Sequence, residues 1–161
     1  MTIKVGDTMP SATVKVIGDG DPQDFSTEDL FKGKKIALFA VPGAFTPTCS
    51  AKHLPDYIQN ADALKAKGVD SIICLSVNDP FVMKAWSESQ GALGAITMIA
   101  DGSGQYADAL GLTFDGSAFG LGTRAQRFSI LIDDNIVKNL NIEESPGAFE
   151  VSGADKILAL L

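Results

Sequence analysis

The sequence predicts an α/β fold in which helices flank a central sheet that has an antiparallel pair of strands at one edge. Three nearly all-apolar runs, at 36–41, 70–77 and 96–100, are typical of strands covered on both faces of a parallel sheet. Segments with a helical spacing of apolar residues separate these runs. Two further runs, 127–132 and 136–142, surround a short polar turn and indicate a β-hairpin. This alternation of strands and helices is typical of α/β proteins.

Composition limits the class of protein. The 161 residues suit one domain, spanning 1–161, that buries a core without disulfides. With 13 basic and 20 acidic residues, a net charge of −7 and no Lys/Arg cluster, the chain is not expected to bind nucleic acid. No apolar run approaches the roughly 20 residues of a membrane span, and residues 1–10 carry charges where a signal peptide is apolar. We expect a cytoplasmic protein with both cysteines reduced.

The first elements precede the central sheet. Ala12 to Ile17 alternates as a short strand does, and the turn-forming residues 18–22 end it. Ser26 is a suitable N-cap for a brief helical turn that runs through Phe31. The chain then enters the strand at 36–41.

A helix is expected after that strand. Thr46 suits its N-cap and Pro47 its first position, where a missing N–H costs nothing. Pro55 should bend or restart the helix, because proline removes a backbone bond and collides with the preceding turn. Gly68 is placed to end it. The apolar residues with helical spacing are Leu54, Tyr57, Ile58, Ala61 and Leu64.

The second half alternates in the same way before its pattern changes. Asn78-Asp79-Pro80 starts a helix after the strand at 70–77, and a short helix at 103–110 follows the strand at 96–100. The inward stripe expected for the first of these helices is Phe81, Val82, Ala85 and Trp86. Residues 113–123 combine glycines with two phenylalanines, which indicates an irregular loop, and 152–161 closes the chain as an amphipathic helix.

Cys49 is the main candidate for chemistry. It would be the third residue of the helix that Thr46 caps, among backbone N–H groups that lack partners and at the positive end of the helix dipole. Such surroundings favour thiolate over thiol. The competing interpretation is a buried structural cysteine, the commoner fate of a free thiol. The proline, the cap and the loop all converge on this position, and they favour the interpretation of Cys49 as a reactive thiolate.

Several other chemistries fit poorly. With two cysteines, one histidine and no C-x-x-C motif, neither a metal site nor a thioredoxin-type dithiol is expected, and no cofactor is implied. A cysteine hydrolase would need His53 as its base, but His53 is four residues after Cys49 on the same helix and lacks an orienting third group. We interpret His53 as a partly exposed or hydrogen-bonded helix residue. A lone thiolate can instead attack the O–O bond of a peroxide and become a sulfenic acid.

The residues around Cys49 resemble a known family. The spacing Pro42-x-x-x-Thr46-x-x-Cys49, within Pro-Gly-Ala-Phe-Thr-Pro-Thr-Cys-Ser, is similar to the peroxiredoxin signature, and with His53-Leu54-Pro55 it resembles the peroxiredoxin 5, or type II, subfamily. Residues 65–70 and 76–83 and the Arg127-Phe128-Ser129 strand are also similar, so the resemblance covers most of the chain.

This resemblance implies a thioredoxin-like fold, with a central mixed sheet flanked by helices, and reduction of hydrogen peroxide and organic hydroperoxides. It implies that Cys49 is the peroxidatic cysteine, that Thr46 hydrogen-bonds the peroxide, that Pro42 shields the thiolate and that Arg127 pairs with the sulfur. Arg124 is a weaker rival for the last role. The resemblance also implies a homodimer, for which Phe-containing loops are candidates.

Cys74 leaves the regeneration route open. It is 25 residues after Cys49 (74 − 49), as is the second cysteine of plant-like type II members, and it is a possible resolving cysteine. Its place within an apolar strand indicates packing instead, and a disulfide needs Cα atoms within about 7 Å. Either thioredoxin reduces a Cys49–Cys74 bridge, or glutathione or glutaredoxin resolves Cys49 directly, the route we favour. The alternative function is a non-catalytic thiol redox sensor or binding module.

Overall fold

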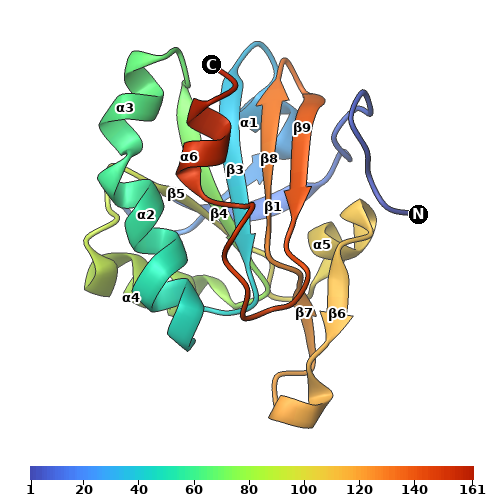
Figure 1. Ribbon diagram of the computed structural model, residues 1–161. Coiled ribbons are helices and arrows are strands. Elements are labelled where there is room, and N and C mark those ends of the chain that lie inside the picture. The colour runs from blue at the N-terminus through green and yellow to red at the C-terminus, as the bar shows by residue number, and fades with distance from the viewer.

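A computed structural model describes residues 1–161, and its central element is a seven-stranded mixed sheet with the order β2-β1-β5-β4-β3-β8-β9 (Figure 1). The three central strands β3, β4 and β5 are parallel, and the strands added at either side pair antiparallel. The predicted α/β architecture with an antiparallel hairpin at one edge is therefore confirmed. The strands are β1 (Thr13–Ile17), β2 (Gln23–Ser26), β3 (Lys35–Val41), β4 (Ser71–Ser76), β5 (Thr97–Ala100), β8 (Phe128–Asp133) and β9 (Ile136–Ile142).

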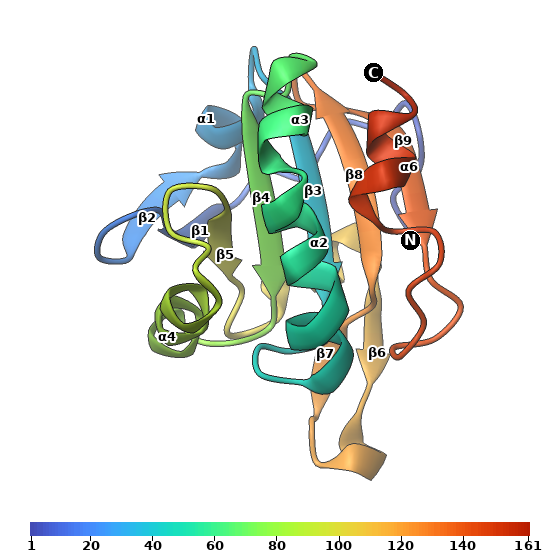
Figure 2. The same ribbon diagram turned by 60° about the vertical axis from the view of Figure 1, so that its left-hand side comes forward.

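Helices cover both faces of this sheet (Figures 1 and 2). One apolar core lies under α2, α3, α4 and α6, and a second lies on the opposite face under α1 and α5. The helices are α1 (Thr27–Phe31), α2 (Leu54–Gln59), α3 (Ala61–Ala66), α4 (Pro80–Gln90), α5 (Gln105–Leu110) and α6 (Ala154–Leu158).

Strand β3 shows how the sequence divides between the two cores. All of Ile36–Val41 is buried, and successive side chains alternate between the faces because a strand has a two-residue period. Phe39 packs into the core under α2, whereas Leu38 packs into the opposite one. In the parallel pairing of β3 with β4, Phe39 lies opposite Cys74, so Cys74 belongs to the core under α2.

Helix α4 starts as predicted but buries a different set of side chains from the one expected. The Asp79 side chain accepts a hydrogen bond from the Val82 N–H at 2.9 Å, and Gly91 ends the helix with φ of 70°. Met83, Trp86 and Ser87 are the buried residues. The expected inward positions Phe81 and Ala85 are wrong, because the buried stripe follows the spacing 83, 86 and 87 and leaves both of them exposed.

The segment predicted as an irregular loop is instead a short two-stranded arm. Strands β6 (Thr113–Asp115) and β7 (Thr123–Ala125) pair antiparallel around a 3₁₀ turn at Ser117–Phe119. The arm extends from the body of the molecule (Figures 1 and 2). Strand β2 was also not predicted, and α6 spans only part of the helix expected at 152–161.

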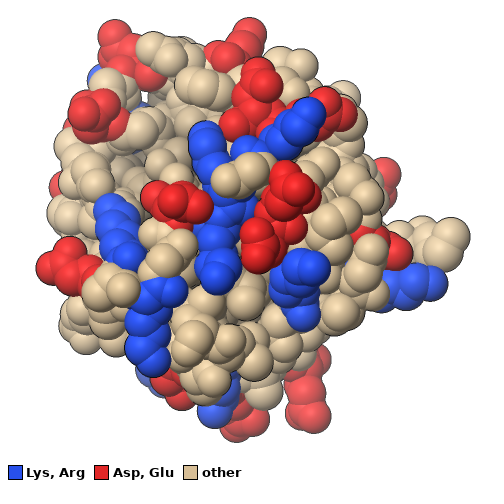
Figure 3. Space-filling view, turned by 90° about the horizontal axis from the view of Figure 1, so that it is seen from above, with Lys and Arg blue, Asp and Glu red and all other residues tan.

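Charges of both signs are interspersed over the face that is seen from above Figure 1 (Figure 3). None of the helices combines the length and the apolar character that a membrane crossing requires.

Gly111 provides a test of the packing between the N-terminus and α5. Its φ is +73°, and a Cβ atom there would lie 2.7 Å from the Thr2 Cα. Gly91 has a similar φ of +70° with open space around it, so Gly91→Ala is a matched control. We expect Gly91→Ala to lower the free energy of unfolding by about 1 kcal/mol and Gly111→Ala by about 1–3 kcal/mol more, measured by urea denaturation. Equal losses would contradict the close packing.

Candidate active site

The loop after β3 delivers Cys49 at the start of a helix. The helix begins at Pro47, and the Thr46 carbonyl accepts the first intrahelical bond from the Ser50 N–H at 3.0 Å. Thr46 is thus the N-cap residue, as predicted, but its hydroxyl does not cap the helix. It donates instead to the Gly43 carbonyl at 2.6 Å. The lone pairs of this hydroxyl therefore remain available as acceptors.

Cys49 begins a wide helical turn. Residues Cys49–His53 form a π-helical turn, in which the Leu54 N–H bonds to the Cys49 carbonyl, and α2 follows with Pro55 in its first turn. Pro55 was expected to bend or restart the helix, and the helix changes from the π turn to α2 at the residue before it. Single π turns inside helices are frequent at functional sites. Here the turn directs both Cys49 and His53 into the protein, and both side chains are fully buried.

Side chains from other elements hold the loop in place. The Asn78 side-chain oxygen accepts hydrogen bonds from the Ala44 N–H at 2.9 Å and from the Ser76 hydroxyl at 2.6 Å. Arg124 donates to the Pro42 carbonyl at 3.2 Å. A Cβ on Gly43 would lie 2.5 Å from the Arg124 Nη1. Arg124 therefore supports this loop, and a side chain at position 43 would displace its guanidinium.

Arg127 is the arginine that contacts Cys49. It lies just before β8, is only 2% exposed, and donates from Nη2 to the Cys49 Sγ at 3.0 Å. Its Nε donates to the Pro146 carbonyl at 3.0 Å, and its Nη1 lies 2.8 Å from the His53 Nδ1. No Asp or Glu forms an ion pair with it. Among the groups that Arg127 contacts directly, the sulfur of Cys49 is the one that can carry a negative charge.

His53 is neutral and fully hydrogen-bonded. Its Nε2 donates to the Ser152 carbonyl at 3.1 Å, and its Nδ1 faces Arg127. Burial, and then the charge of Arg127, lower the pKa of His53 from 6.5 to about 3. The hydrogen-bonded interpretation of His53 is confirmed, and partial exposure is wrong. Because Nδ1 faces Arg127 rather than the sulfur, His53 is not placed as the base of a cysteine hydrolase.

Cys74 has a different environment from Cys49. It is fully buried in β4, and burial, and then the nearby Cys49, raise the pKa of its thiol well above the ordinary value. No disulfide joins it to Cys49. Cys74 therefore resembles a packed apolar thiol.

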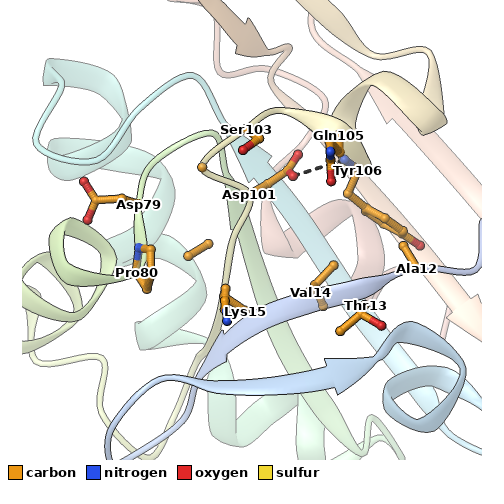
Figure 4. Close-up of a pocket in the computed structure, with 12 residues that line it drawn as sticks. Ala12, Thr13, Val14, Lys15, Asp79, Pro80, Asp101, Ser103, Gln105 and Tyr106 are labelled. Atoms are coloured by element: carbon orange, nitrogen blue, oxygen red, sulfur yellow. Dashed lines mark hydrogen bonds between the residues drawn. The ribbon is translucent and has the colours of Figure 1, made fainter.

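A cavity of about 520 Å³ lies away from this cluster, between β1 and the starts of α4 and α5 (Figure 4). None of Cys49, Thr46 and Arg127 lines it. Asp101, its most buried carboxylate, accepts hydrogen bonds from the Tyr106 and Ala107 N–H groups at 3.1 and 2.8 Å and so caps α5. The chemistry is therefore assigned to the cluster around Cys49.

Comparison with known proteins identifies the family. The redoxin family model matches residues 4–158. Peroxiredoxin-2B of Arabidopsis thaliana is 51% identical over 99% of this chain and 98% of its own length. The chain is a peroxiredoxin. Reduced Prx3 of Vibrio vulnificus, solved in complex with hydrogen peroxide, is 52% identical with a TM-score of 0.91 and covers 99% of this chain and 96% of its own. Peroxiredoxin 5 of Alvinella pompejana is 36% identical with a TM-score of 0.84, covering 98% of this chain and 96% of its own.

These similarities place the peroxiredoxin in the type II subfamily, with the thioredoxin-like fold that the sequence resemblance implied. It is a thiol-dependent peroxidase, an antioxidant enzyme with its peroxidatic cysteine, Cys49, beside Arg127. The enzyme interpretation thus replaces that of a non-catalytic redox sensor. Relatives named as chloroplastic and mitochondrial are among those found, so the cytoplasmic location stays a prediction.

His53, the only histidine of the chain, should dominate the pH dependence of stability between pH 7 and pH 5. Its pKa is lower in the folded state, so the unfolded state binds the proton first and stability is lost as the pH falls below 6.5. We expect urea denaturation to show a loss of about 2 kcal/mol over that range. In His53→Asn this loss should nearly vanish. An unchanged pH dependence in His53→Asn would contradict a neutral, buried His53.

Proposed function

We propose that this peroxiredoxin reduces hydrogen peroxide and organic hydroperoxides through a sulfenic acid on Cys49, with Arg127, Thr46 and Pro42 completing the catalytic site. The observation that carries the proposal is the buried Arg127 guanidinium, which lies 3.0 Å from the sulfur and has no carboxylate partner. A permanent cation there favours the thiolate, the form that reacts. The complex of Vibrio vulnificus Prx3 with hydrogen peroxide supports the choice of substrate.

The proposed step is a displacement on oxygen. The Cys49 thiolate attacks the terminal peroxide oxygen, the S–O bond forms and the O–O bond breaks. Sulfur loses two electrons and the peroxide gains them. The attacked oxygen keeps its hydrogen and stays on sulfur as the sulfenic acid, while the other oxygen leaves as alkoxide or hydroxide and takes a proton from solvent. Arg127 has N–H groups beyond those already bonded that can stabilise the charge developing on these oxygens.

Thr46 and Pro42 would orient the peroxide and protect the sulfur. Because the Thr46 hydroxyl donates to Gly43 at 2.6 Å, it is set to accept a hydrogen bond from the O–H of the peroxide. Pro42 is buried beside the loop and offers no backbone N–H to compete for the sulfur. In this arrangement Thr46 accepts a hydrogen bond from the peroxide and Arg127 donates hydrogen bonds to it.

Rapid mixing of the reduced protein with hydrogen peroxide tests these roles. Cys49→Ser should abolish fast peroxide consumption. Thr46→Val should lower the second-order rate constant by roughly 100- to 1,000-fold, because it removes the acceptor from a site that electrostatic preorganisation controls. Thr46→Ser keeps the hydroxyl and is the matched control, expected within about tenfold of the wild type. Equal rates for Thr46→Val and Thr46→Ser would exclude the proposed role of the hydroxyl.

For regeneration, we propose that glutathione or glutaredoxin resolves Cys49 directly and that Cys74 serves as packing. The supporting observations are the complete burial of Cys74 and the raised pKa of its thiol, which keep it protonated and a poor nucleophile. Glutathione condenses with the sulfenic acid to give a mixed disulfide and water. A second thiol then attacks the glutathione sulfur and releases the reduced Cys49. The competing route is a Cys49–Cys74 bridge that thioredoxin reduces.

Cys74→Ser discriminates between the routes. Turnover with glutathione and glutaredoxin should persist in the variant, since no step of the favoured route uses Cys74. Mass spectrometry after one equivalent of peroxide should show wild-type protein carrying an added oxygen atom. Loss of turnover in Cys74→Ser, or a product lighter by one water that contains a Cys49–Cys74 linkage, would establish the bridge instead.

We also propose a homodimer. Phe45, Phe81 and Phe119 are exposed by 56%, 78% and 79%, and they lie on the active-site loop, at the start of α4 and on the β6–β7 arm. Exposed apolar side chains mark a contact surface where they form one patch, so we propose that a second copy of the chain covers these three. Light scattering of the wild type and of Phe119→Ser measures the association directly.

A further inference from the structure

A continuous series of hydrogen bonds links the C-terminal segment to the reactive sulfur. The Ser152 carbonyl accepts from His53 Nε2, His53 Nδ1 lies 2.8 Å from Arg127 Nη1, and Arg127 Nη2 donates to Cys49 Sγ. His53, Arg127 and Cys49 are all buried, so water does not replace these bonds at low cost. The mechanism above uses Cys49 and Arg127 and leaves His53 without a role.

We propose that His53 is the positioning residue of this peroxiredoxin: its unprotonated Nδ1 accepts from Arg127 and thereby orients the guanidinium toward the Cys49 sulfur. The proposal rests on the function proposed for Arg127, and His53 acts only through it. Arg127 is otherwise anchored by a single bond, from Nε to the Pro146 carbonyl, about which the planar group could still swing. The bond to His53 fixes a second nitrogen, Nη1. Because the guanidinium is planar and rigid, the third nitrogen, Nη2, then faces the sulfur.

The backbone determines which ring nitrogen of His53 carries the proton. A carbonyl oxygen only accepts, so the nitrogen facing Ser152, Nε2, must carry hydrogen, and a neutral ring then presents a lone pair at Nδ1. This lone pair is what the Arg127 donor requires. A protonated His53 would bring a second cation against the guanidinium.

The Ser152 carbonyl is itself held from two sides. Tyr57 donates its hydroxyl to the same oxygen at 2.8 Å. Glu143 accepts from the backbone N–H groups of 150–152 and from the Ser152 hydroxyl, at 2.6–3.0 Å. Although burial alone raises the pKa of Glu143, these bonds lower it below the usual value, so the carboxylate stays charged. The carbonyl that sets the tautomer of His53 is therefore a fixed part of the site.

Packing is the competing explanation. The His53 ring lies 4.7 Å from that of Phe39 and 4.9 Å from that of Phe149, so it also fills space between aromatic side chains. A role in packing alone would require a ring of this shape but not a lone pair at Nδ1. The two explanations therefore differ in what each substitution of His53 should do.

Three substitutions separate them. His53→Asn places an amide oxygen near the position of Nδ1 and keeps the acceptor, His53→Gln places an amide near Nε2 and keeps the donor, and His53→Phe keeps the ring alone. Tyr57→Phe is the matched control, because it removes a hydrogen bond to the same Ser152 carbonyl while Glu143 still holds Ser152 and the bond between His53 and Arg127 stays intact. Urea denaturation confirms that each variant is folded.

The readouts are the second-order rate constant with hydrogen peroxide and the pH midpoint of the thiolate absorbance of Cys49, measured in Cys74→Ser protein. We expect rate losses of roughly 10- to 100-fold in His53→Phe and His53→Gln, with the midpoint moved to higher pH. His53→Asn should retain most of the rate, and Tyr57→Phe should match the wild type. In an Arg127→Gln background, already slow if Arg127 has its proposed role, His53→Phe should cost nothing more.

Other outcomes would overturn the proposal. Wild-type rates in all three His53 variants would exclude a positioning role, and equal losses in these variants and Tyr57→Phe would reduce it to packing. If Arg127→Gln itself reacts as fast as the wild type, the proposed function of Arg127 fails rather than the link to His53.

A measurement on the wild type does not depend on any variant folding. Because the chain has one histidine, ¹⁵N-histidine labelling gives the nitrogen signals of His53 alone. We expect a protonated Nε2 and an unprotonated Nδ1 that stay unchanged from pH 8 to pH 5. A proton on Nδ1 would contradict the proposal directly.

Discussion

The structure around the active site depends on one buried guanidinium. Burying a cation is costly unless hydrogen bonds and an opposite charge compensate for the lost hydration. Arg127 donates hydrogen bonds to Pro146 and His53, but no carboxylate forms an ion pair with it, so the Cys49 sulfur is the group in direct contact with it that can carry a compensating charge. The same contact that helps to accommodate the arginine inside the protein therefore places a positive charge against the Cys49 sulfur.

The sheet brings these two groups together. Strands β3 and β8 are antiparallel neighbours, and Ala40, near the end of β3, pairs with Phe128 at the start of β8. The chain leaving β3 and the chain entering β8 therefore lie side by side, which places Arg127 next to the loop that carries Cys49. Asn78 and Arg124 then fix that loop from outside. A contact between residues 78 positions apart thus follows from strand register.

The part of this arrangement that depends on residues close together in the chain can be predicted from the sequence. The strand, the loop, the helix start and the reactive Cys49 follow from apolar runs and capping residues within a short window, and so do α1 and α4. Arg127 was identified only through resemblance, because no local pattern distinguishes it from Arg124. The role of His53 depends on the Ser152 carbonyl, 99 residues away, which no local signal reveals. The outward orientation of Phe81 could not be read from spacing either, since its apolar character suits an exposed contact surface equally well.

The two thiols show how one core produces opposite reactivities. Both belong to the core under α2 and neither is exposed, yet only Cys49 accepts a hydrogen bond from Arg127 and lies at the start of a helix. Burial without a partner keeps Cys74 protonated. The reactivity proposed for Cys49 therefore depends on what contacts its sulfur and not on its depth in the core, which the two thiols share.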